Sequence, residues 1–289
     1  MSKTLLSLGH GYSARALSRR LIADGWTVIG TTRSPEKAAA IAAEGVEPLI
    51  WPGMPLAPAL DRASHVLSSI GPGEDGDPVV AALSDDLAAA APHLEWVGYL
   101  STTAVYGDHE GDWVDENTPL APASRRGALR VQAEGEWQAL AARSGLPLHI
   151  FRLAGIYGPG RGPFAKLRDG SARRIVKPGQ VFSRIHVDDI AQALTASMNR
   201  PVTGAIYNLC DDEPAPPQDV IGYAADLLGI PRPPEVSFDE ADLSPMARSF
   251  YGESKRVRND RIKRDLGLRL IHPTYREGLA ATLAAEAAH

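Results

Sequence analysis

The stretch from Lys3 to Leu17, KTLLSLGHGYSARAL, decides the fold. An apolar run typical of a strand leads into Gly9-x-Gly11-x-x-Ala14, and a helix-like run follows at once. Gly9 permits a tight turn, Gly11 lets the backbone approach a pyrophosphate, and Ala14 lets the helix pack near the strand. The free N–H groups and the positive dipole end of the helix favour phosphate there. The pattern predicts a dinucleotide site, and the alternative is a tight turn without a ligand.

The composition fits a folded domain and argues against several partners. The 289 residues are 44% hydrophobic and 22% charged, enough for one large domain or two small ones with a packed core. The net charge of −5 gives no reason to expect nucleic acid or an anionic membrane. The sequence has no apolar segment of membrane-spanning length, so we expect a cytoplasmic location. The single cysteine, Cys210, excludes an internal disulfide and a cysteine zinc cage, and we predict no metal site.

Strand-like and helix-like runs alternate along the chain. The strand-like runs are Thr4–Leu8, Thr27–Thr31, Pro48–Trp51, His65–Ser68, Trp96–Ser101, His149–Arg152 and Ile206–Leu209. The helix-like runs are Ser13–Asp24, Pro35–Glu44, Pro78–Ala91, Arg126–Ser144 and Val187–Met198. Strands separated by helices of this length favour right-handed crossovers. We therefore predict an α/β fold with a doubly wound parallel sheet of the Rossmann type and a small C-terminal substrate lobe.

The composition shifts near Gly155, which sets the expected domain boundary. Gly/Pro clusters that follow predict loops, and they lie at Gly155–Pro163, Glu213–Pro217 and Pro231–Pro234. We assign residues 1–154, joined by about 181–211, to an NADP-binding Rossmann domain. Residues 155–180 and 212–289 form the small substrate-binding lobe, which also contains a basic, helix-like segment at Ser254–Gly267.

The end of the second predicted strand indicates which dinucleotide binds. A site that prefers NAD commonly has an acidic residue there, but this chain has Thr32, Arg33 and Ser34, with Lys37 one turn later. Arg33 can make a bidentate contact with a 2′-phosphate. The alternative is a helix entry, with Ser34 as N-cap and Pro35 in the first turn, and both can hold together. We predict NADP(H).

Four stretches resemble the extended short-chain dehydrogenases/reductases, the group with NAD-dependent sugar epimerases and dehydratases. Gly9–Ala14 resembles the cofactor loop, and Leu100–Gly107 resembles the strand with a catalytic Ser or Thr. Arg152–Gly160 resembles the loop that closes over the nicotinamide, and Arg184–Ala191 resembles the late helix start. The chain is most similar to atypical bacterial members of the YeeZ type. The resemblance implies that the segment after the fourth strand, with Ser68 and Ser69, meets the cofactor ribose.

The chain departs from this group at the catalytic helix. Typical members carry Tyr-x-x-x-Lys there, with a Glu one turn beyond the Lys. Aligning Glu134 with that Glu puts Arg126 at the tyrosine position and Arg130 at the lysine position. A guanidinium stays charged at any ordinary pH, so Arg126 cannot carry a proton. Arg130 could still bind the ribose and supply positive charge.

Other side chains could take over the chemistry. Thr102 stands where the group's hydroxyl polarises the substrate carbonyl, and the alternative is a hydroxyl that caps a loop. Tyr106 could act as the proton carrier if Arg126 and Arg130 lower its pKa, and the alternative is a residue of the pocket wall. We assign His186 and Asp188 to structure.

Two charged regions allow more than one interpretation. The acidic loop around Trp113 is expected to be solvated rather than to bind metal, and Trp113 either covers the pocket or anchors the loop. A basic patch of the final third indicates an anionic substrate or a solvated face. It comprises Phe164, Lys166, Arg168, Arg173, Arg174 and Lys177.

The sequence thus predicts an NADP(H)-binding oxidoreductase or epimerase-like protein that acts on a small molecule, with a non-catalytic NADP(H) sensor or scaffold as the alternative. A homodimer through Pro78–Ala91 and Arg126–Ser144 is expected by resemblance. The predicted catalytic residues are Thr102, Tyr106 and Arg130. The predicted cofactor-binding residues are Gly9, Gly11, Tyr12, Ser13, Ala14, Thr32, Arg33, Ser34, Ser68, Ser69, Arg130 and Gly155.

Overall fold

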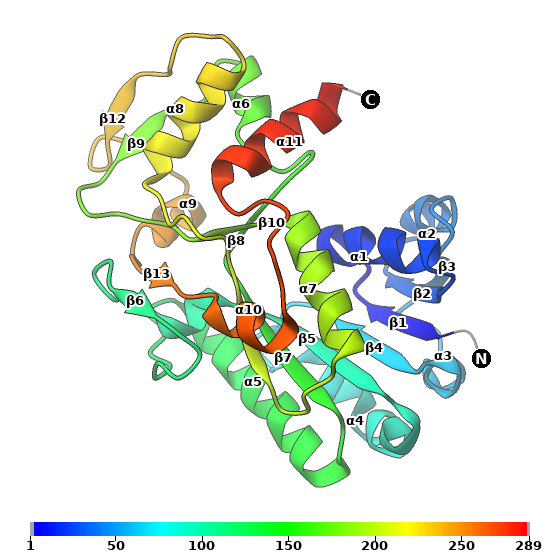
Figure 1. Cartoon of the computed structure of the whole chain (residues 1–289). Helices are drawn as coiled ribbons and strands as arrows, with labels where there is room; N and C mark the ends of the chain where they lie inside the picture. The colour runs from blue at the N-terminus through cyan, green and yellow to red at the C-terminus, as the bar shows by residue number, and fades with distance from the viewer. Residues whose placement is uncertain (1–2, 288–289) are drawn as a thin grey trace.

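Seven parallel strands form one central sheet in the computed structural model, which describes residues 3–287 (Figure 1). Their order is β11-β7-β5-β4-β1-β2-β3. The strands are β1 Thr4–Leu8, β2 Thr27–Thr32, β3 Glu47–Ile50, β4 His65–Ser68, β5 Trp96–Thr102, β7 Leu148–Leu153 and β11 Ile206–Leu209. Each coincides with a predicted run to within one residue at either end. The predicted doubly wound parallel sheet is confirmed.

Helices cover both faces of the sheet. On one face α1 packs against α7, and α2 and α10 contribute to the same core. On the other face α4 packs against α3 and α5. The first group is α1 Tyr12–Ala23, α2 Pro35–Ala42, α7 Val187–Asn199 and α10 Asp260–Leu266, and the second is α3 Ala57–Arg62, α4 Pro78–Ala90 and α5 Arg125–Ser144. The short helix α3 was not predicted.

The strand order reverses beside β1, and this places the functional end of the sheet. β1 pairs with β2 on one side and with β4 on the other, and all five of its residues are buried. In sheets of this kind ligands bind in the crevice outside the carboxyl ends of the strands where the order reverses. The turn at Gly9 lies at that crevice because it follows the carboxyl end of β1 directly.

A second group of elements has its own small core at one end of the molecule, far from α4 (Figure 1). Its helices are α6 Phe164–Arg168, α8 Pro217–Leu227, α9 Pro245–Phe250 and α11 Tyr275–Ala287. Its strand pairs are β8 Gly155–Tyr157 with β10 Arg184–His186, and β9 Arg174–Val176 with β12 Glu235–Ser237. The exact domain boundaries predicted above stay a prediction.

The helix predicted over Ser254–Gly267 is wrong in its first half. Only Asp260–Leu266 is helical, and Arg256–Val257 forms strand β13, parallel to β6 at Trp113–Val114. The amide of Arg256 donates to the carbonyl of Asp112 at 2.9 Å. Tertiary pairing therefore overrides the helical pattern of this segment.

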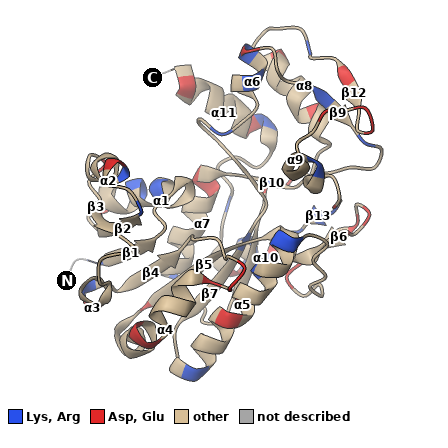
Figure 2. Cartoon of the chain, turned by 180° about the vertical axis from the view of Figure 1, so that it is seen from behind, with Lys and Arg blue, Asp and Glu red and all other residues tan. Residues whose placement is uncertain are grey.

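Charges of both signs are interspersed over the helices in the view of Figure 2. Ion pairs such as Arg62 with Glu47, at 2.8 Å, lie at the surface, where solvent screening leaves each of them little effect on stability. Every helix within residues 3–287 is too short or too polar to span a membrane.

We expect Gly98→Ala to destabilise the fold by about 1–3 kcal/mol, because an added Cβ would collide with the ring of Trp96, two residues earlier on β5. Urea unfolding measures the change. Gly135→Ala on α5 is the matched control: nothing lies within 4 Å of its added Cβ, so it should be neutral or stabilise by up to about 1 kcal/mol. Equal effects of the two variants would contradict the packing argument.

Candidate functional site

A cleft of about 1410 Å³ lies between the carboxyl end of the sheet and the second group of elements. Both parts of the chain contribute to its wall. Residues from the sheet side include Gly9, Gly11, Tyr12, Ser13, Ser69, Thr102, Thr103, Ser124, Arg126 and Arg130, and Gly155 of β8 also lines the cleft. Residues from the other side include Arg161, Lys166, Arg173, Arg184, Tyr251, Lys255 and Tyr275. The cleft therefore brings together most residues predicted for the cofactor and two of the three predicted for catalysis.

The turn after β1 is held by the second strand. Gly9 has a φ of +79°, and an added Cβ there would collide with the side chain of Ile70. Its amide donates to Oγ1 of Thr31 at 2.8 Å, and the amide of His10 donates to the carbonyl of Thr31 at 3.0 Å. Only glycine fits this turn without strain. Thr31 was not singled out in the sequence because its role depends on strand pairing.

His10 holds the same loop in place through contacts with β1 and α1. Its Nδ1 lies 3.0 Å from Oγ of Ser7, and its Nε2 lies 3.4 Å from Oγ of Ser18. Burial lowers the pKa of His10 to about 4, so the ring is neutral near pH 7. His10 therefore links β1 to α1 and supplies no charge to the cleft.

The start of α1 fits the pyrophosphate of a dinucleotide. Gly11 is the N-cap and has no side chain to bond the first N–H groups, so those of Tyr12 and Ser13 stay free of a side-chain cap. An added Cβ on Gly11 would meet only the carbonyl of Gly9, at 3.8 Å, so the approach to this backbone is open. Ala14 is buried against the sheet. A phosphate would be bound here by peptide N–H groups and the helix dipole.

The residues after β2 lie outside the wall of the 1410 Å³ cleft. Oγ of Ser34 accepts from the amide of Lys37 at 3.2 Å, so Ser34 is the N-cap of α2. The amide of Ser34 lies 3.4 Å from Oγ1 of Thr32. Arg33 is exposed, and none of the ion pairs within residues 3–287 includes it. Its guanidinium is therefore available to a ligand.

The two serines after β4 differ in position. Ser69 lies in the cleft wall and its hydroxyl donates to the carbonyl of Gly9. Ser68 is fully buried, and its Oγ has no hydrogen-bond partner among residues 3–287. Because Ser68 does not reach the cleft, the cofactor contact predicted for it is not supported by its position.

Thr102 ends β5 with its hydroxyl at the cleft. Its Oγ1 accepts from the amide of Ala104 at 3.2 Å, so the predicted capping role is present. No acceptor for the hydroxyl proton of Thr102 lies among residues 3–287, and that proton can therefore be donated to a ligand. The capping and donating roles are compatible.

Two guanidinium groups on α5 line the cleft one turn apart. Nη1 of Arg130 donates to the carbonyl of Leu100, beside the end of β5. Arg126 is exposed, and its guanidinium lies 4.4 Å from the ring centre of Phe250 on α9. Gly127 has no room for a Cβ against the carbonyl of Ala104, which lets α5 approach the end of β5 closely. The helix therefore presents fixed positive charge to the cleft.

Tyr106 does not belong to this site. It is fully buried and is not part of the cleft wall. Its hydroxyl donates to Oδ1 of Asn208 at 2.7 Å and accepts from Nη1 of Arg152 at 2.9 Å. Burial raises the pKa of Tyr106 to about 12. The predicted role as proton carrier is therefore contradicted, because the phenol is withdrawn from ligands and hard to ionise.

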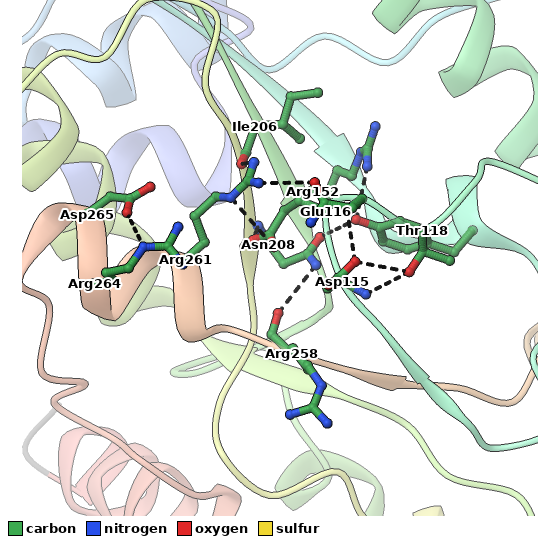
Figure 3. A network of polar contacts seen from close by, with 12 residues as sticks. Asp115, Glu116, Thr118, Arg152, Ile206, Asn208, Arg258, Arg261, Arg264 and Asp265 are labelled. Atoms are coloured by element: carbon green, nitrogen blue, oxygen red, sulfur yellow. Dashed lines mark hydrogen bonds and ion pairs between the residues drawn. The ribbon is translucent and has the colours of Figure 1, made fainter.

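A buried polar network lies below the end of β5. Arg152 pairs with Glu134 at 2.7 Å, and the hydroxyl of Ser101 donates to Glu134 at 2.6 Å. Figure 3 shows the continuation of the network at Asn208. The backbone amide of Asn208 donates to Oε1 of Glu116 at 2.9 Å. These bonds join β5, α5, β7 and β11 into a rigid floor for the cleft.

The acidic loop around Trp113, which includes Asp108, is hydrogen-bonded to a distant segment of the chain rather than only solvated. Oδ1 of Asp108 accepts from the amide of Ser254 at 2.7 Å. Trp113 is 48% exposed and lies outside the cleft wall. The guanidinium of Arg258 lies over its ring, 5.0 Å from the ring centre. Of the two alternatives for Trp113, the position fits a loop anchor.

The start of α7 brings together three side chains with metal-ligand chemistry, His186, Asp188 and His272. The carboxylate of Asp188 lies 3.6 Å from a ring nitrogen of each histidine. Nδ1 of His186 already accepts from the amide of Asp188 at 3.2 Å, as an N-cap does. That bond uses the lone pair a metal would need, so we assign the group to helix capping.

The predicted basic patch separates into two sets. Lys166 and Arg173 reach the cleft wall. Arg168 pairs with Glu286 at 2.7 Å, and Arg174 pairs with Glu235 at 2.8 Å. Lys177 donates to the carbonyl of Tyr251, and Phe164 is buried. Only part of this patch can therefore contact a ligand.

With this geometry established, the comparison with known families is direct. The sequence profile of the NAD dependent epimerase/dehydratase family matches residues 64–210, just over half of the chain. The chain belongs to this family. The matched residues include β5 with Thr102 and the whole of α5. The family assignment confirms the resemblance found in the sequence motifs.

Related proteins cover nearly the whole chain. Protein YeeZ from Escherichia coli K12 is 28% identical over 288 residues, which cover 94% of this chain and 97% of YeeZ. A solved structure of a functionally unknown conserved protein from Silicibacter pomeroyi DSS is 64% identical, with a TM-score of 0.94 and coverage of 98% and 99%. UDP-glucuronic acid 4-epimerase from Bacillus cereus, solved with NAD, shares the fold at 17% identity, with a TM-score of 0.78 and 99% coverage of both chains.

Several cleft residues were missed because no local pattern marks them. Arg184 and Lys255 come from segments far from the dinucleotide motif, and Ser124 precedes α5 without a motif of its own. The sequence shows a basic residue, Arg184, just before the late helix start. It does not show which groups surround that side chain.

We expect Tyr106→Phe to lower stability by about 1–2 kcal/mol, because Asn208 and Arg152 lose a buried hydrogen-bond partner. Urea unfolding measures the loss. Binding of NADPH, followed by fluorescence, should be unchanged because the hydroxyl lies outside the cleft. Tyr12→Phe is the matched control, since that partly exposed hydroxyl bonds only the carbonyl of Pro159 and should cost less. Weaker NADPH binding by Tyr106→Phe would return this residue to the site.

Proposed function

We propose that the chain is an NADP(H)-binding oxidoreductase or epimerase-like enzyme that acts on a small anionic molecule. One observation carries the proposal: the Gly9–Ala14 loop, Thr102 and Arg130 come from separate elements and meet at one cleft. A nicotinamide dinucleotide, when bound, supplies hydride transfer. The family relationship supports the cofactor class, and the NADP preference rests on this chain's own residues.

Arg33 supports NADP(H) over NAD(H). It follows β2 at the position where an acid would accept from the ribose hydroxyls, and it is exposed and free of ion pairs with residues 3–287. A guanidinium there would bind a 2′-phosphate through a charge-assisted contact. Ser34 caps α2 with its Oγ, so Arg33 is the stronger candidate of the two.

The side chains around the end of β5 could stabilise a reacting oxygen without tyrosine. The hydroxyl of Thr102 can donate to a substrate carbonyl. Arg126 and Arg130 hold positive charge where negative charge would develop, and neither can carry a proton at ordinary pH. Their part would be to bind and orient, with any proton exchanged through solvent or the substrate.

The charges in the cleft wall support an anionic substrate. Basic residues outnumber acidic ones there. The acidic members are Asp242 and Glu253, and the basic ones are Arg126, Arg130, Arg161, Lys166, Arg173, Arg184 and Lys255. Glu253 is already paired with Lys255 at 2.7 Å. An anion would therefore enter a field of matching sign.

A non-catalytic NADP(H) sensor is the second candidate, and Arg126 favours it. This residue stands at the tyrosine position and contacts Phe250 on the facing helix α9. A contact across the cleft of this kind could report whether a ligand is bound. The predicted cytoplasmic location stays a prediction.

We also propose a homodimer formed through α4 and α5. The two helices pack side by side at one edge of the fold (Figure 1). Their exposed positions carry small side chains that allow close helix packing. These are Ala81, Ala82, Ala89, Ala128 and Ala139.

NADPH should bind more tightly than NADH, and Arg33→Ala should remove about tenfold or more of that preference by deleting one bidentate phosphate contact. Calorimetric titration with both reduced dinucleotides measures it. Arg62→Ala removes the same charge from the exposed helix α3 and should leave the preference unchanged. A full preference in Arg33→Ala would refute the assignment of Arg33, and absence of binding by either dinucleotide would refute the proposed function.

Turnover separates the enzyme from the sensor. With a panel of small carbonyl compounds that carry a carboxylate or a phosphate, NADPH absorbance should fall in the presence of at least one of them. Thr102→Val should then lower kcat by about a hundredfold with NADPH affinity unchanged, because it removes one donor to the reacting oxygen. Ser171→Ala, which removes a hydroxyl from an exposed residue of the same cleft wall, is the control. NADPH binding without turnover across the panel would favour the sensor.

A further inference from the structure

Arg184 is a cleft-wall arginine that forms no ion pair within residues 3–287 and is held by backbone carbonyls instead. Arg184 begins β10, in register with Gly155 of β8, and its side chain lines the cleft. Its Nη1 donates to the carbonyls of Phe182, at 2.8 Å, and Ala215, at 3.0 Å. These bonds fix the guanidinium plane, and they leave the edge formed by Nε and Nη2 without a partner among residues 3–287. That edge is suited to a bidentate contact with a carboxylate.

Arg152, which is buried where Arg184 is half-buried, is paired. Arg152 uses Nε and Nη2 on the carboxylate of Glu134, at 3.1 and 2.7 Å. None of the ion pairs within the described part of the chain includes Arg184. Desolvation lowers the pKa of Arg184, which reflects the cost of this unpaired charge. A ligand carboxylate would remove that cost.

The nearby acid Asp211 interacts with the charge of Arg184 but forms no ion pair with it among residues 3–287. Asp211 is fully buried, and its Oδ2 has no hydrogen-bond partner in the described part of the chain. Burial raises the pKa of Asp211 to about 8, so most of this carboxyl is protonated near neutral pH. The Nε and Nη2 edge of Arg184, which no described residue bonds, is therefore available to a group that enters the cleft.

Apolar side chains contribute to the wall in the same half of the cleft as Arg184. The ring centre of Phe182 lies 5.9 Å from its guanidinium carbon. Other apolar members of this half of the cleft are Ile175, Val220, Val236, Leu243, Phe250 and Leu279. Arg173 uses its Nη1 on the carbonyls of Gly170 and Ala172 and is exposed. An arginine oriented by backbone carbonyls in a wall that also has apolar side chains fits the carboxylate of a ligand with an apolar body.

We propose that Arg184 binds the carboxylate of a small substrate whose body is apolar or aromatic, through its Nε and Nη2. Arg184 is thus a binding residue that sets substrate class. The inference rests on the proposed function, because it concerns the same cleft.

The first test uses the wild-type protein saturated with NADPH. Calorimetry compares 3-phenylpropionate, its methyl ester and UDP-glucose, each at up to millimolar concentration. The acid should bind about tenfold more tightly than the ester, since only the acid can accept the bidentate contact. Equal affinity for acid and ester, tighter binding of UDP-glucose, or no saturation by the acid would overturn the proposal.

The second test locates the contact. Arg184→Gln should weaken the acid about tenfold or more and leave the ester unchanged, and Arg184→Lys, which keeps the charge but not the fork, should lose affinity to an intermediate degree. Arg173→Gln, an exposed residue of the same wall, should change the affinity by less than about threefold. An equal loss in Arg184→Gln and Arg173→Gln would mean that general charge, not this contact, holds the acid.

NADPH affinity, measured on each variant, separates the two proposals. If NADPH binds but the acid fails, only the role of Arg184 is wrong. If NADPH does not bind to the wild type, the proposed function itself fails. If Arg184→Gln does not fold, the acid-against-ester comparison on the wild type and the Arg184→Lys variant still decide.

Discussion

The buried pair of Glu134 and Arg152 holds together the floor on which the cleft depends. It joins the middle of α5 to β7, and through Ser101 and Tyr106 it reaches β5 and β11. Removing one partner of such a pair commonly costs about 3–5 kcal/mol, because the other charge stays buried and unpaired. With α5 fixed in this way, Arg126, Arg130 and the end of β5 keep their positions at the cleft.

Buried and half-buried arginines of this chain have two kinds of partner, a carboxylate or backbone carbonyls, and their role differs accordingly. Arg152 is paired with a carboxylate of its own chain and acts in the scaffold. Arg130 and Arg184 each use Nη1 to donate to backbone carbonyls, and both side chains line the cleft. A guanidinium anchored by carbonyls is oriented but not neutralised, which is what recognition of a ligand anion requires.

The sequence predicted the seven strands and the glycine turn after the first strand well, because each depends on local pattern. Apolar runs separated by helices specify a parallel sheet, and glycine at a turn with positive φ is marked by its own identity. The site was predicted less completely. Tyr106 follows Thr102 by four residues, yet its side chain points into the network with Asn208, a residue of β11. The segment Ser254–Gly267 has helical composition, but its first half pairs with β6. Both errors come from partners that are distant in the chain.

The sequence by itself determined the fold class, the family and the position of the glycine turn between the first strand and the first helix. Only the tertiary structure decided which polar side chains face the cleft, which are neutralised by a buried partner, and that Arg184 has a free edge. The physical reason is one of range. Turns and strand patterns are set by neighbouring residues, whereas the burial and pairing of a charge depend on which distant segments pack around it.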